Sequence, residues 1–365
     1  MNPTAPRVVV AGGHSAGHIE PAMNFADALR RLAPSAEVTA LGTIRGLDTT
    51  LIPARGYPLE LIPPVPLPRK VTRALLHTPT QLRASIRAAG TVLDQVQADV
   101  VVGFGGYVAA PAYLAARQRR LPIVIHEANV RPGAANRLAA LLTPHVYTAS
   151  PDVRLKNGTA IGIPLRPAIT GLDRAAVREA ARQRFGLNTD DPVLLVTGGS
   201  QGATAINVAA SGAAPALRAA GVQVLHITGP QHIVEAGDPS YVVLPYVDEM
   251  QYAYAAADFA ICRSGAMTCA ELAAVGLPAA FVPLPDRGGE QRLNAGPVVA
   301  AGGALLVNDA DLTPAWIESA LIPILTDPTR ITAMSARASA TGTPNADTAL
   351  ARQVLTIAER HRPAR

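Results

Sequence analysis

Short apolar runs alternate with alanine-rich stretches from one end of the chain to the other. Within most runs the apolar residues are consecutive, which is typical of strands buried on both faces, whereas the alanine-rich stretches are typical of helices. This alternation predicts an α/β fold in which parallel sheets are covered by helices on both faces. The expected strands are RVVVAG, EVTALGT, PLELI, DVVVGF, PIVIHE, HVYTA and TAIGI in the first half, and PVLLVTG, VQVLHITG, YVVLPYV, DFAICR, PAAFVPL and GALLV in the second.

The two halves repeat one pattern, because VVVAGGHSAG at 8–17 aligns with LLVTGGSQGA at 194–203. We therefore predict two Rossmann-like domains, residues 1–165 and 166–345, joined near the proline-containing stretch IGIPLRPAI. A last helix over 346–361 is expected to pack back on the first domain. Since ligands of such folds bind beyond the carboxyl ends of the strands, we expect the active site in a cleft across which the two sheets face each other.

The composition is that of a folded protein with large cores, because 49% of its 365 residues are hydrophobic and only 16% are charged. It has no uninterrupted apolar run of 18 residues, and Met1 is followed closely by RVVVAGG, which leaves no room for a signal peptide. We therefore expect a cytoplasmic chain. Cys262 and Cys269 are too few for a disulfide framework or a zinc cluster, so we interpret them as small buried side chains.

Positive charge is concentrated in the first half, which carries a net +8 over residues 1–165 against −3 over 166–365. Residues 61–93 contain no acid, and apolar residues lie between Arg69, Lys70 and Arg73. One interpretation is a solvated helix face with its linker, and the other is a surface that binds anionic lipid through these three cations. A nucleic-acid partner is not expected, because the segment has no aromatic residue on which bases could stack.

GGSQGATAIN at 198–207 is the strongest candidate for a phosphate-binding loop. Its glycines allow backbone amides to approach an anion, Ser200 and Gln201 add polar contacts, and the following helix directs its positive end at the charge. The alternative is an ordinary tight turn. No Gly-Lys-Ser/Thr follows, no clean G-x-G-x-x-G is present, and the second strand does not end on an acid. These absences argue against a P-loop NTPase and against a nicotinamide-dependent dehydrogenase.

Three further polar residues fit a nucleotide sugar, each with an ordinary alternative. Glu271 can accept two hydrogen bonds from a ribose diol, or it can be a surface acid near a helix N-terminus. Asn129 can donate to and accept from sugar hydroxyls, or it can be a turn residue. Arg166 lies at the expected join, where its guanidinium could bind a diphosphate or remain unattached.

Three pairs consist of residue types that can ligate a metal: His14 with His18, His126 with Glu127, and Asp309 with Asp311. The first pair spans a turn without an evident third ligand, and the second points to opposite faces of a strand. Asp311, followed by Leu-Thr-Pro, is typical of a helix cap. We expect no metal site.

Taken in order, nine motifs resemble the peptidoglycan glycosyltransferases of the MurG family over residues 7 to about 310. They are GGHSAGHIEPA, GFGGYVAAP, HEANVRPGAANR, GIPLR, GGSQGA, YVDEM, CRSGAMTCAEL, GLPAAFVPLP and GEQRLNA. The resemblance implies a GT-B fold and inverting transfer of N-acetylglucosamine from UDP-N-acetylglucosamine to the muramoyl 4-hydroxyl of lipid I, undecaprenyl-pyrophosphoryl-MurNAc-pentapeptide. The product is the β-1,4 bond of lipid II, so the implied role is in peptidoglycan and cell-wall synthesis, cell shape and cell division. UDP-N-acetylglucosamine is a substrate, and no cofactor is expected.

The resemblance also implies which residues bind the substrates. The donor would be bound by Ser200, Gln201 and Gly202 at the diphosphate, Val247 at the uracil, Ala266, Met267, Thr268 and Glu271 along the nucleoside, and Gln291 near the sugar, joined by Ser15, Ala16, Gly17, Asn129 and Arg166. Many family members read GGTGGH in the first loop, where this chain has GGHSAGH. Aligned from the right, Ser15 takes the place of the threonine and His14 is an extra residue without an assigned role.

His18 suits the general base that the acceptor hydroxyl needs, because imidazole titrates close to neutral pH. It could equally position the acceptor, or merely satisfy the loop backbone. The implied location is the cytoplasmic side of the cell membrane, with peripheral contact to anionic lipid and other cell-wall synthesis proteins as further candidate partners. The alternative functions are a UDP-N-acetylglucosamine 2-epimerase, a natural-product glycosyltransferase, and a nonenzymatic scaffold that binds the UDP-sugar at the membrane.

Overall fold

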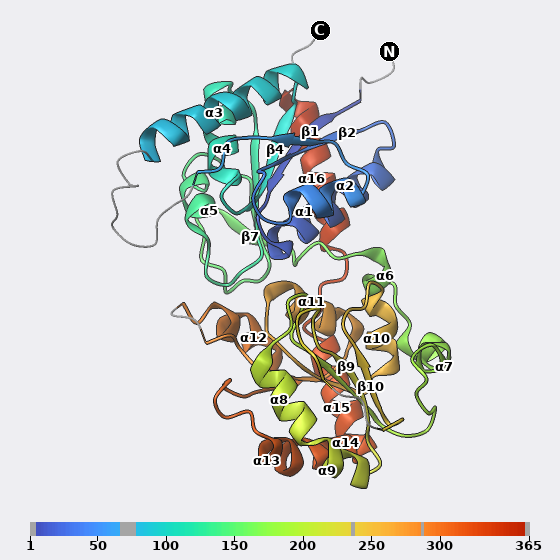
Figure 1. Ribbon diagram of the computed structural model, residues 1–365. Coiled ribbons are helices and arrows are strands. Elements are labelled where there is room, and N and C mark those ends of the chain that lie inside the picture. The colour runs from blue at the N-terminus through green and yellow to red at the C-terminus, as the bar shows by residue number, and fades with distance from the viewer. Residues whose placement is uncertain (1–4, 66–77, 235–237, 286–287, 362–365) are drawn as a thin grey trace. The chain divides into compact units, whose positions relative to one another are not determined.

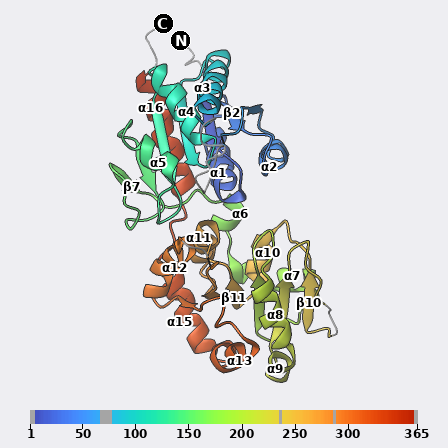
Figure 2. The ribbon, with the colours of Figure 1, turned by 60° about the vertical axis from the view of Figure 1, so that its left-hand side comes forward.

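The computed structural model describes residues 5–65, 78–234, 238–285 and 288–361. Its backbone contacts divide the chain into two compact units, which we call unit 1 (residues 1–165 and 344–365) and unit 2 (residues 166–343). Each unit is a parallel β-sheet flanked by helices (Figures 1 and 2). The structure therefore confirms the expected α/β class with two Rossmann-like domains.

The sheet of unit 1 has seven strands in the order β3-β2-β1-β4-β5-β6-β7. Neighbouring strands are all parallel. The order reverses between β1 and β4, so the loops that follow these two strands lie side by side at the switch point where such sheets bind ligands. The strands are β1 Arg7–Gly12, β2 Glu37–Gly42, β3 Leu59–Leu61, β4 Val100–Gly105, β5 Ile123–Glu127, β6 Val146–Thr148 and β7 Gly158–Ala160.

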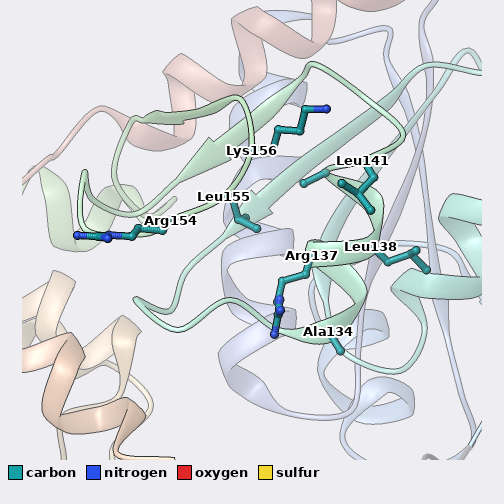
Figure 3. Close-up of a pocket in the computed structure, with 8 residues that line it drawn as sticks. Ala134, Arg137, Leu138, Leu141, Arg154, Leu155 and Lys156 are labelled. Atoms are coloured by element: carbon teal, nitrogen blue, oxygen red, sulfur yellow. The ribbon is translucent and has the colours of Figure 1, made fainter.

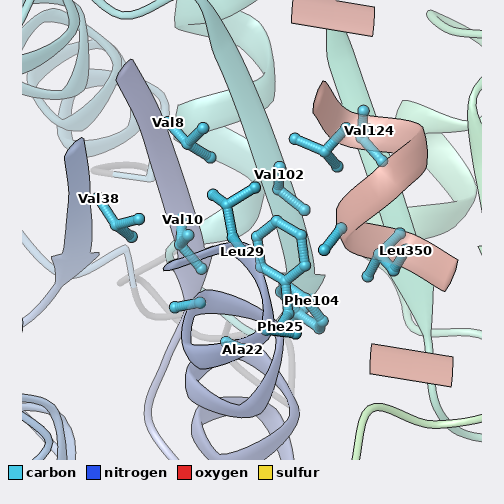
Figure 4. Close-up of a cluster of buried hydrophobic side chains, with 14 of the residues drawn as sticks. Val8, Val10, Ala22, Phe25, Leu29, Val38, Val102, Phe104, Val124 and Leu350 are labelled. Atoms are coloured by element: carbon cyan, nitrogen blue, oxygen red, sulfur yellow. The ribbon is translucent and has the colours of Figure 1, made fainter. Parts of the chain in front are cut away.

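Helices cover both faces of this sheet. One face packs against α1 and the C-terminal helix α16, and Figure 4 shows Phe25 of α1 and Leu350 of α16 beside Phe104 of β4. The other face packs against α3, α4 and α5. The helices of unit 1 are α1 Ala16–Leu32, α2 Asp48–Ala54, α3 Thr78–Gln95, α4 Ala109–Gln118, α5 Ala134–Ala139 and α16 Ala346–His361.

Unit 2 repeats the strand order of unit 1 with one strand fewer, β10-β9-β8-β11-β12-β13, again entirely parallel. Its switch point lies between β8 and β11, so the loops after these strands carry its candidate site. The repeat seen in the sequence is therefore a repeat of topology. The strands are β8 Val193–Thr197, β9 Gln223–Ile227, β10 Tyr241–Leu244, β11 Phe259–Cys262, β12 Ala279–Phe281 and β13 Ala304–Leu306.

The helices of unit 2 include one cap that differs from the sequence expectation. Thr313, and not Asp311, caps α13, because the Thr313 side chain accepts from the Trp316 backbone N–H while Asp311 accepts from the Asn308 side chain at 2.6 Å. Cys262 and Cys269 are buried, as expected. The helices are α6 Pro167–Thr170, α7 Arg174–Arg184, α8 Thr204–Gly212, α9 Ala214–Ala219, α10 Met250–Ala256, α11 Ala266–Val275, α12 Glu290–Ala300, α13 Pro314–Trp316, the π-helical turn η2 Ile317–Leu321, α14 Ile322–Leu325 and α15 Pro328–Ser339. Over the described residues, no helix is both long and apolar enough to cross a membrane.

A buried histidine joins β9, β10 and α8. His226 is fully buried, with Nδ1 2.8 Å from the Tyr241 hydroxyl and Nε2 3.1 Å from Asn207 Oδ1. Since the Asn207 amide nitrogen already donates to the Thr228 carbonyl, Oδ1 must be the acceptor, so Nε2 carries the proton and Nδ1 accepts from the tyrosine. Burial lowers the pKa of His226 to about 4, which keeps it neutral in this network.

We expect unit 2 to lose stability as the pH falls from about 6.5 to about 4. In this window the unfolded chain protonates His226 and the folded chain does not, so the free energy of unfolding decreases, by up to about 3 kcal/mol. Trp316, the single tryptophan, lies in unit 2 and reports its unfolding in urea by fluorescence. His226→Gln should flatten the pH dependence in this window, and an unchanged profile would contradict the assignment.

Candidate active site

The turn between β1 and α1 is closely packed, which explains its glycines. A Cβ on Gly12 would lie 2.8 Å from the His18 carbonyl oxygen, and one on Gly13 would lie 2.9 Å from both Asp48 Oδ2 and Val108 Cγ2. Neither position can hold a side chain without displacing its neighbours. The backbone of Gly12 and Gly13 therefore packs directly against its neighbours, with no room for a side chain.

His14, the extra residue of this turn, has a structural explanation. Its φ of 79° is left-handed, and its backbone N–H donates to Asp48 Oδ1 at 2.5 Å. Asp48 is fully buried and also accepts from the Thr43 backbone N–H at 2.8 Å, so it ties the loop after β2 to this turn. The His14 side chain is exposed and its ring lies edge-on to Tyr107, with centroids 5.4 Å apart.

His18 and Ser15 contact each other at the start of α1. Ser15 is the N-cap residue, and its Oγ lies 2.9 Å from His18 Nδ1 instead of capping the helix. Ala16 and Gly17 form the first turn above it, and no side-chain cap is made to this turn. When Nδ1–H donates to Ser15 Oγ, Nε2 is left as the basic nitrogen of the ring.

The His18 ring lies against the glycine turn that follows β4. A Cβ on Gly105, whose φ is 88°, would be 3.2 Å from His18 Cδ2 and 3.4 Å from the Asn136 amide nitrogen. Burial lowers the pKa of His18, and the nearby His14 lowers it further, while Asp48 partly opposes both. The ring is therefore in its neutral, proton-accepting form at neutral pH.

A buried carboxylate that the sequence interpretation missed shapes the loop carrying Asn129. Glu127 is 3% exposed and accepts from the backbone N–H groups of Asn129 and Gly133 at 3.0 Å each and from the Asn136 side chain at 2.9 Å. Asn136 in turn accepts from the Tyr113 hydroxyl at 2.7 Å. Burial raises the pKa of Glu127 and these hydrogen bonds oppose the increase. The signal for this role in the sequence is an acid that ends a largely apolar strand directly before a turn.

In unit 2 the loop GGSQG follows β8, as expected. Gly199 and Gly202 have φ values of 86° and 74°, and the Gly202 N–H donates to the Gly199 carbonyl, which closes the turn. The side chains of Ser200 and Gln201 are exposed, and helix α8 begins at Thr204 without a side-chain cap. The loop thus presents polar groups and the uncapped amino end of α8 on one side of the unit.

The loop after β11 carries the second polar group of unit 2. Ser264 is fully buried and its hydroxyl has no hydrogen-bond partner among the described residues. The next residue, Gly265, is the N-cap of α11, again without a side-chain cap, and Ala266, Met267 and Thr268 form its partly exposed first turn. An unpaired buried hydroxyl below an uncapped helix end is suited to an anion.

Glu271, in the second turn of α11, is 8% exposed and accepts from the Tyr254 hydroxyl at 2.7 Å. Arg166 is the N-cap residue of α6 and is close enough to Tyr254 for its charge to lower the pKa of that phenol. The structure therefore brings Glu271 into contact with Tyr254, which the sequence did not single out. Arg166 lies within electrostatic range of the same tyrosine.

The two remaining donor residues lie on other loops of unit 2. Val247 is half-buried in the loop after β10. Gln291, at the start of α12, accepts from the Leu284 backbone N–H at 3.0 Å, so its amide oxygen holds the loop after β12. This hydrogen bond gives Gln291 a role in the structure of the loop after β12, and its contact with the sugar stays a prediction.

The expected membrane residues Arg69, Lys70 and Arg73 lie outside the described residues. Within the described part of unit 1 there is a cationic pocket of about 490 Å³ (Figure 3), and no acid is among its lining residues. It is lined by Ala134, Arg137, Leu138, Ala140, Leu141, Arg154, Leu155 and Lys156.

Among the residues that the structure describes, no group of three or more His, Cys, Asp or Glu side chains is arranged to hold a metal ion, and Asp309 pairs with Arg263.

Two family models match the chain, one in each half. Residues 8–148 match the glycosyltransferase family 28 N-terminal domain, and residues 193–350 match the glycosyltransferase family 28 C-terminal domain. A relative from Thermobifida fusca is 58% identical over 98% of this chain and 96% of its own length. A relative from Streptomyces avermitilis is 55% identical over 97% of this chain and 99% of its own. Both are named UDP-N-acetylglucosamine--N-acetylmuramyl-(pentapeptide) pyrophosphoryl-undecaprenol N-acetylglucosamine transferase.

Solved structures show the same fold. MurG from Acinetobacter baumannii superposes with a TM-score of 0.79 at 27% identity, over 96% of this chain and 99% of that one. The UDP-GlcNAc 2-epimerase from Neisseria meningitidis superposes with a TM-score of 0.68 at 15% identity, over 96% and 100%. The second likeness is one of fold alone.

Proposed function

The chain belongs to glycosyltransferase family 28, and we propose that it transfers N-acetylglucosamine from UDP-N-acetylglucosamine to lipid I, forming lipid II in peptidoglycan synthesis. The observation that carries this function is the similarity, over nearly the full length, to curated relatives of that one name. The 2-epimerase and natural-product enzymes share the fold at much lower identity, which does not favour either alternative.

Donor binding is assigned to unit 2. The UDP diphosphate would be bound by Ser200, Gln201 and Gly202 and by the amino end of α11, where the unpaired Ser264 hydroxyl lies. Glu271 would accept hydrogen bonds from the ribose, and Val247, Gln291 and Arg166 would contact the uracil, the sugar and the nucleotide as in the resemblance. The support is that the polar groups lie at the carboxyl ends of β8 and β11.

Acceptor binding and proton transfer are assigned to unit 1. The muramoyl 4-hydroxyl attacks the anomeric carbon, the bond to the UDP oxygen breaks, and the hydroxyl proton passes to His18 Nε2. Ser15 fixes the tautomer by accepting from Nδ1–H, and Glu127 holds the loop of Asn129. UDP departs with the electron pair of the broken bond and its negative charge. Because the hydroxyl attacks from the face opposite the leaving group, the single displacement inverts the anomeric centre.

One assay separates the candidate functions. The purified chain is incubated with UDP-N-acetylglucosamine labelled in the sugar and with a lipid I analogue, and the label is followed. Transfer into the lipid fraction, dependent on the analogue, is the expected result. Conversion of the sugar to its 2-epimer without the lipid would instead establish an epimerase, and binding without turnover would establish a scaffold.

Peripheral contact with an anionic membrane surface is also proposed for unit 1. The cationic pocket carries Leu138 and Leu141 with 44% and 67% of their surface exposed. In Figure 3 the side chains of Arg137, Arg154 and Lys156 point in different directions around Leu155. Cations spread around exposed leucines suit a lipid surface with several headgroups better than one bound phosphate. The proposed location is the cytoplasmic side of the cell membrane, and Arg69, Lys70 and Arg73 remain candidates for the same contact.

Charge reversal in this pocket should weaken binding to anionic vesicles. The double variant Arg154→Glu and Lys156→Glu is expected to lower the partition coefficient by about tenfold or more, because each cation near the surface contributes about 1 kcal/mol. Arg330→Glu, an exposed cation of unit 2, is the matched control and should have little effect. Sedimentation with vesicles at low and high salt measures both. Equal binding of variant and control would remove this pocket from the membrane surface.

A further inference from the structure

Tyr254 of α10 and Glu271 of α11 form a buried pair between two helices of unit 2. The phenol is 3% exposed and the carboxylate 8%, and the tyrosine hydroxyl donates to Glu271 Oε2 at 2.7 Å. The tyrosine is anchored at its backbone as well, since its carbonyl accepts from the Arg174 guanidinium at 3.0 Å. The donor atom is therefore held in place from both ends of the residue.

The chemistry of the pair sets the direction of this hydrogen bond. Burial raises the pKa of Tyr254 well above its ordinary value, and the charge of Glu271 raises it further, while Arg166 opposes in part. The phenol thus keeps its proton at neutral pH. It remains a donor, and a hydrogen bond from a fixed donor to a carboxylate is among the stronger ones in proteins.

We propose that Tyr254 is a positioning residue that fixes the Glu271 carboxylate in the orientation needed to distinguish ribonucleotide from deoxyribonucleotide donors. The proposal rests on the proposed function, in which Glu271 binds the ribose. A glutamate side chain has three rotatable bonds, and anchoring Oε2 restricts its rotation about them. The plane of the carboxylate is then set before the nucleotide arrives. Without this hydrogen bond the carboxylate would be less firmly oriented, and part of the cost of ordering it would appear in nucleotide affinity.

The test compares Tyr254→Phe with Tyr252→Phe. Tyr252 lies on the same helix, and its ring stacks on the Arg184 guanidinium, so its hydroxyl is a matched control. Tyr254→Phe should raise the KM for UDP-N-acetylglucosamine by about tenfold or more and leave kcat within about twofold, because the lost hydrogen bond acts on binding. The ratio of the inhibition constants of 2′-deoxy-UDP and UDP, which reports recognition of the ribose, should fall toward one. Tyr252→Phe should change neither quantity.

A second comparison covers the case in which Tyr254→Phe does not fold because the carboxylate has lost its donor. The Glu271→Gln variant is compared with the double variant Glu271→Gln and Tyr254→Phe, in which no buried charge is left without its partner. Loss of the hydroxyl should again reduce the discrimination between UDP and 2′-deoxy-UDP. The positioning role is overturned if a folded Tyr254→Phe variant keeps the wild-type discrimination ratio. It is also overturned if Glu271→Gln still favours UDP and the double variant keeps the same ratio. A wild-type chain that binds no UDP at all would instead overturn the proposed function.

Discussion

The His18→Ala variant will lose about 10² to 10⁴ in kcat while its affinity for UDP stays within about twofold. In the proposed mechanism the base accepts the proton of the acceptor hydroxyl. The diphosphate-binding groups of unit 2 cannot take over this proton transfer. The structure gives His18 the features of a base: a neutral ring at neutral pH, Nδ1 held by Ser15, and a position beside the glycine turn after β4. Single-turnover transfer to a lipid I analogue measures the chemical step, and calorimetry measures UDP binding.

His14→Asn is the matched control for this experiment. Asparagine tolerates the left-handed backbone that His14 adopts, so the hydrogen bond from residue 14 to Asp48 is kept while the imidazole is removed. We expect this variant to retain activity within about fivefold, since its ring serves no proton transfer in the proposed mechanism. A loss of less than tenfold for His18→Ala, or an equal loss for both variants, would eliminate His18 as the base.

The fold was accessible from the sequence because the inner strands of both sheets are apolar on both faces. The runs VVVAG and VLLVT can only be buried between helix layers, and the structure places them at the centres of the two sheets, as β1 and β8. The sequence repeat between residues 8–17 and 194–203 corresponds to the same strand order in the sheets of unit 1 and unit 2. The one local error concerned a cap: Pro314 begins α13, and the residue directly before it, Thr313, had the stronger claim over Asp311.

Candidate loops were also accessible, but the groups that hold them were not. Asp48 lies 34 residues from His14, and Tyr254 lies 17 residues from Glu271. Neither spacing has a local signature, since each pair meets only when helices or loops from separate strands come together. The left-handed backbone of His14 was equally hidden, because histidine does not signal this conformation and the hydrogen bond that accompanies it comes from the distant Asp48.

In the proposed mechanism the two glycine turns have the same topology but different chemical roles. After β8 the side chains are the exposed Ser200 and Gln201, so the turn offers uncharged polar contacts to an anion. After β1 the same place holds Ser15 and His18 in direct contact, which makes a proton-accepting ring available. Both turns therefore use glycines where the backbone packs closely against its neighbours. Only the turn after β1 adds the imidazole of the proposed base, His18.

Unit 2 should also be sensitive to the loss of one carboxylate remote from these loops. Asp258 accepts from Arg182 at 2.8 Å, from Arg178 at 2.5 Å, and from the Val193 backbone N–H at 2.8 Å. The Arg182 side chain is fully buried, and its other partners are backbone carbonyls. These contacts tie α7 to the start of β8, the strand that carries the GGSQG loop.

We expect Asp258→Ala to lower the free energy of unfolding of unit 2 by about 3 to 5 kcal/mol, because the buried Arg182 guanidinium would lose the carboxylate with which it forms an ion pair at 2.8 Å. Urea denaturation followed by Trp316 fluorescence measures the loss. Glu249→Ala is the control: it breaks the Arg184–Glu249 pair, both of whose side chains are nearly half exposed, and should cost less than about 1 kcal/mol. If the two variants lose equal stability, the buried pair is no stronger than a surface one. A larger loss for Asp258→Ala would show that the unit carrying the GGSQG loop depends for its stability on the ion pair at the start of β8.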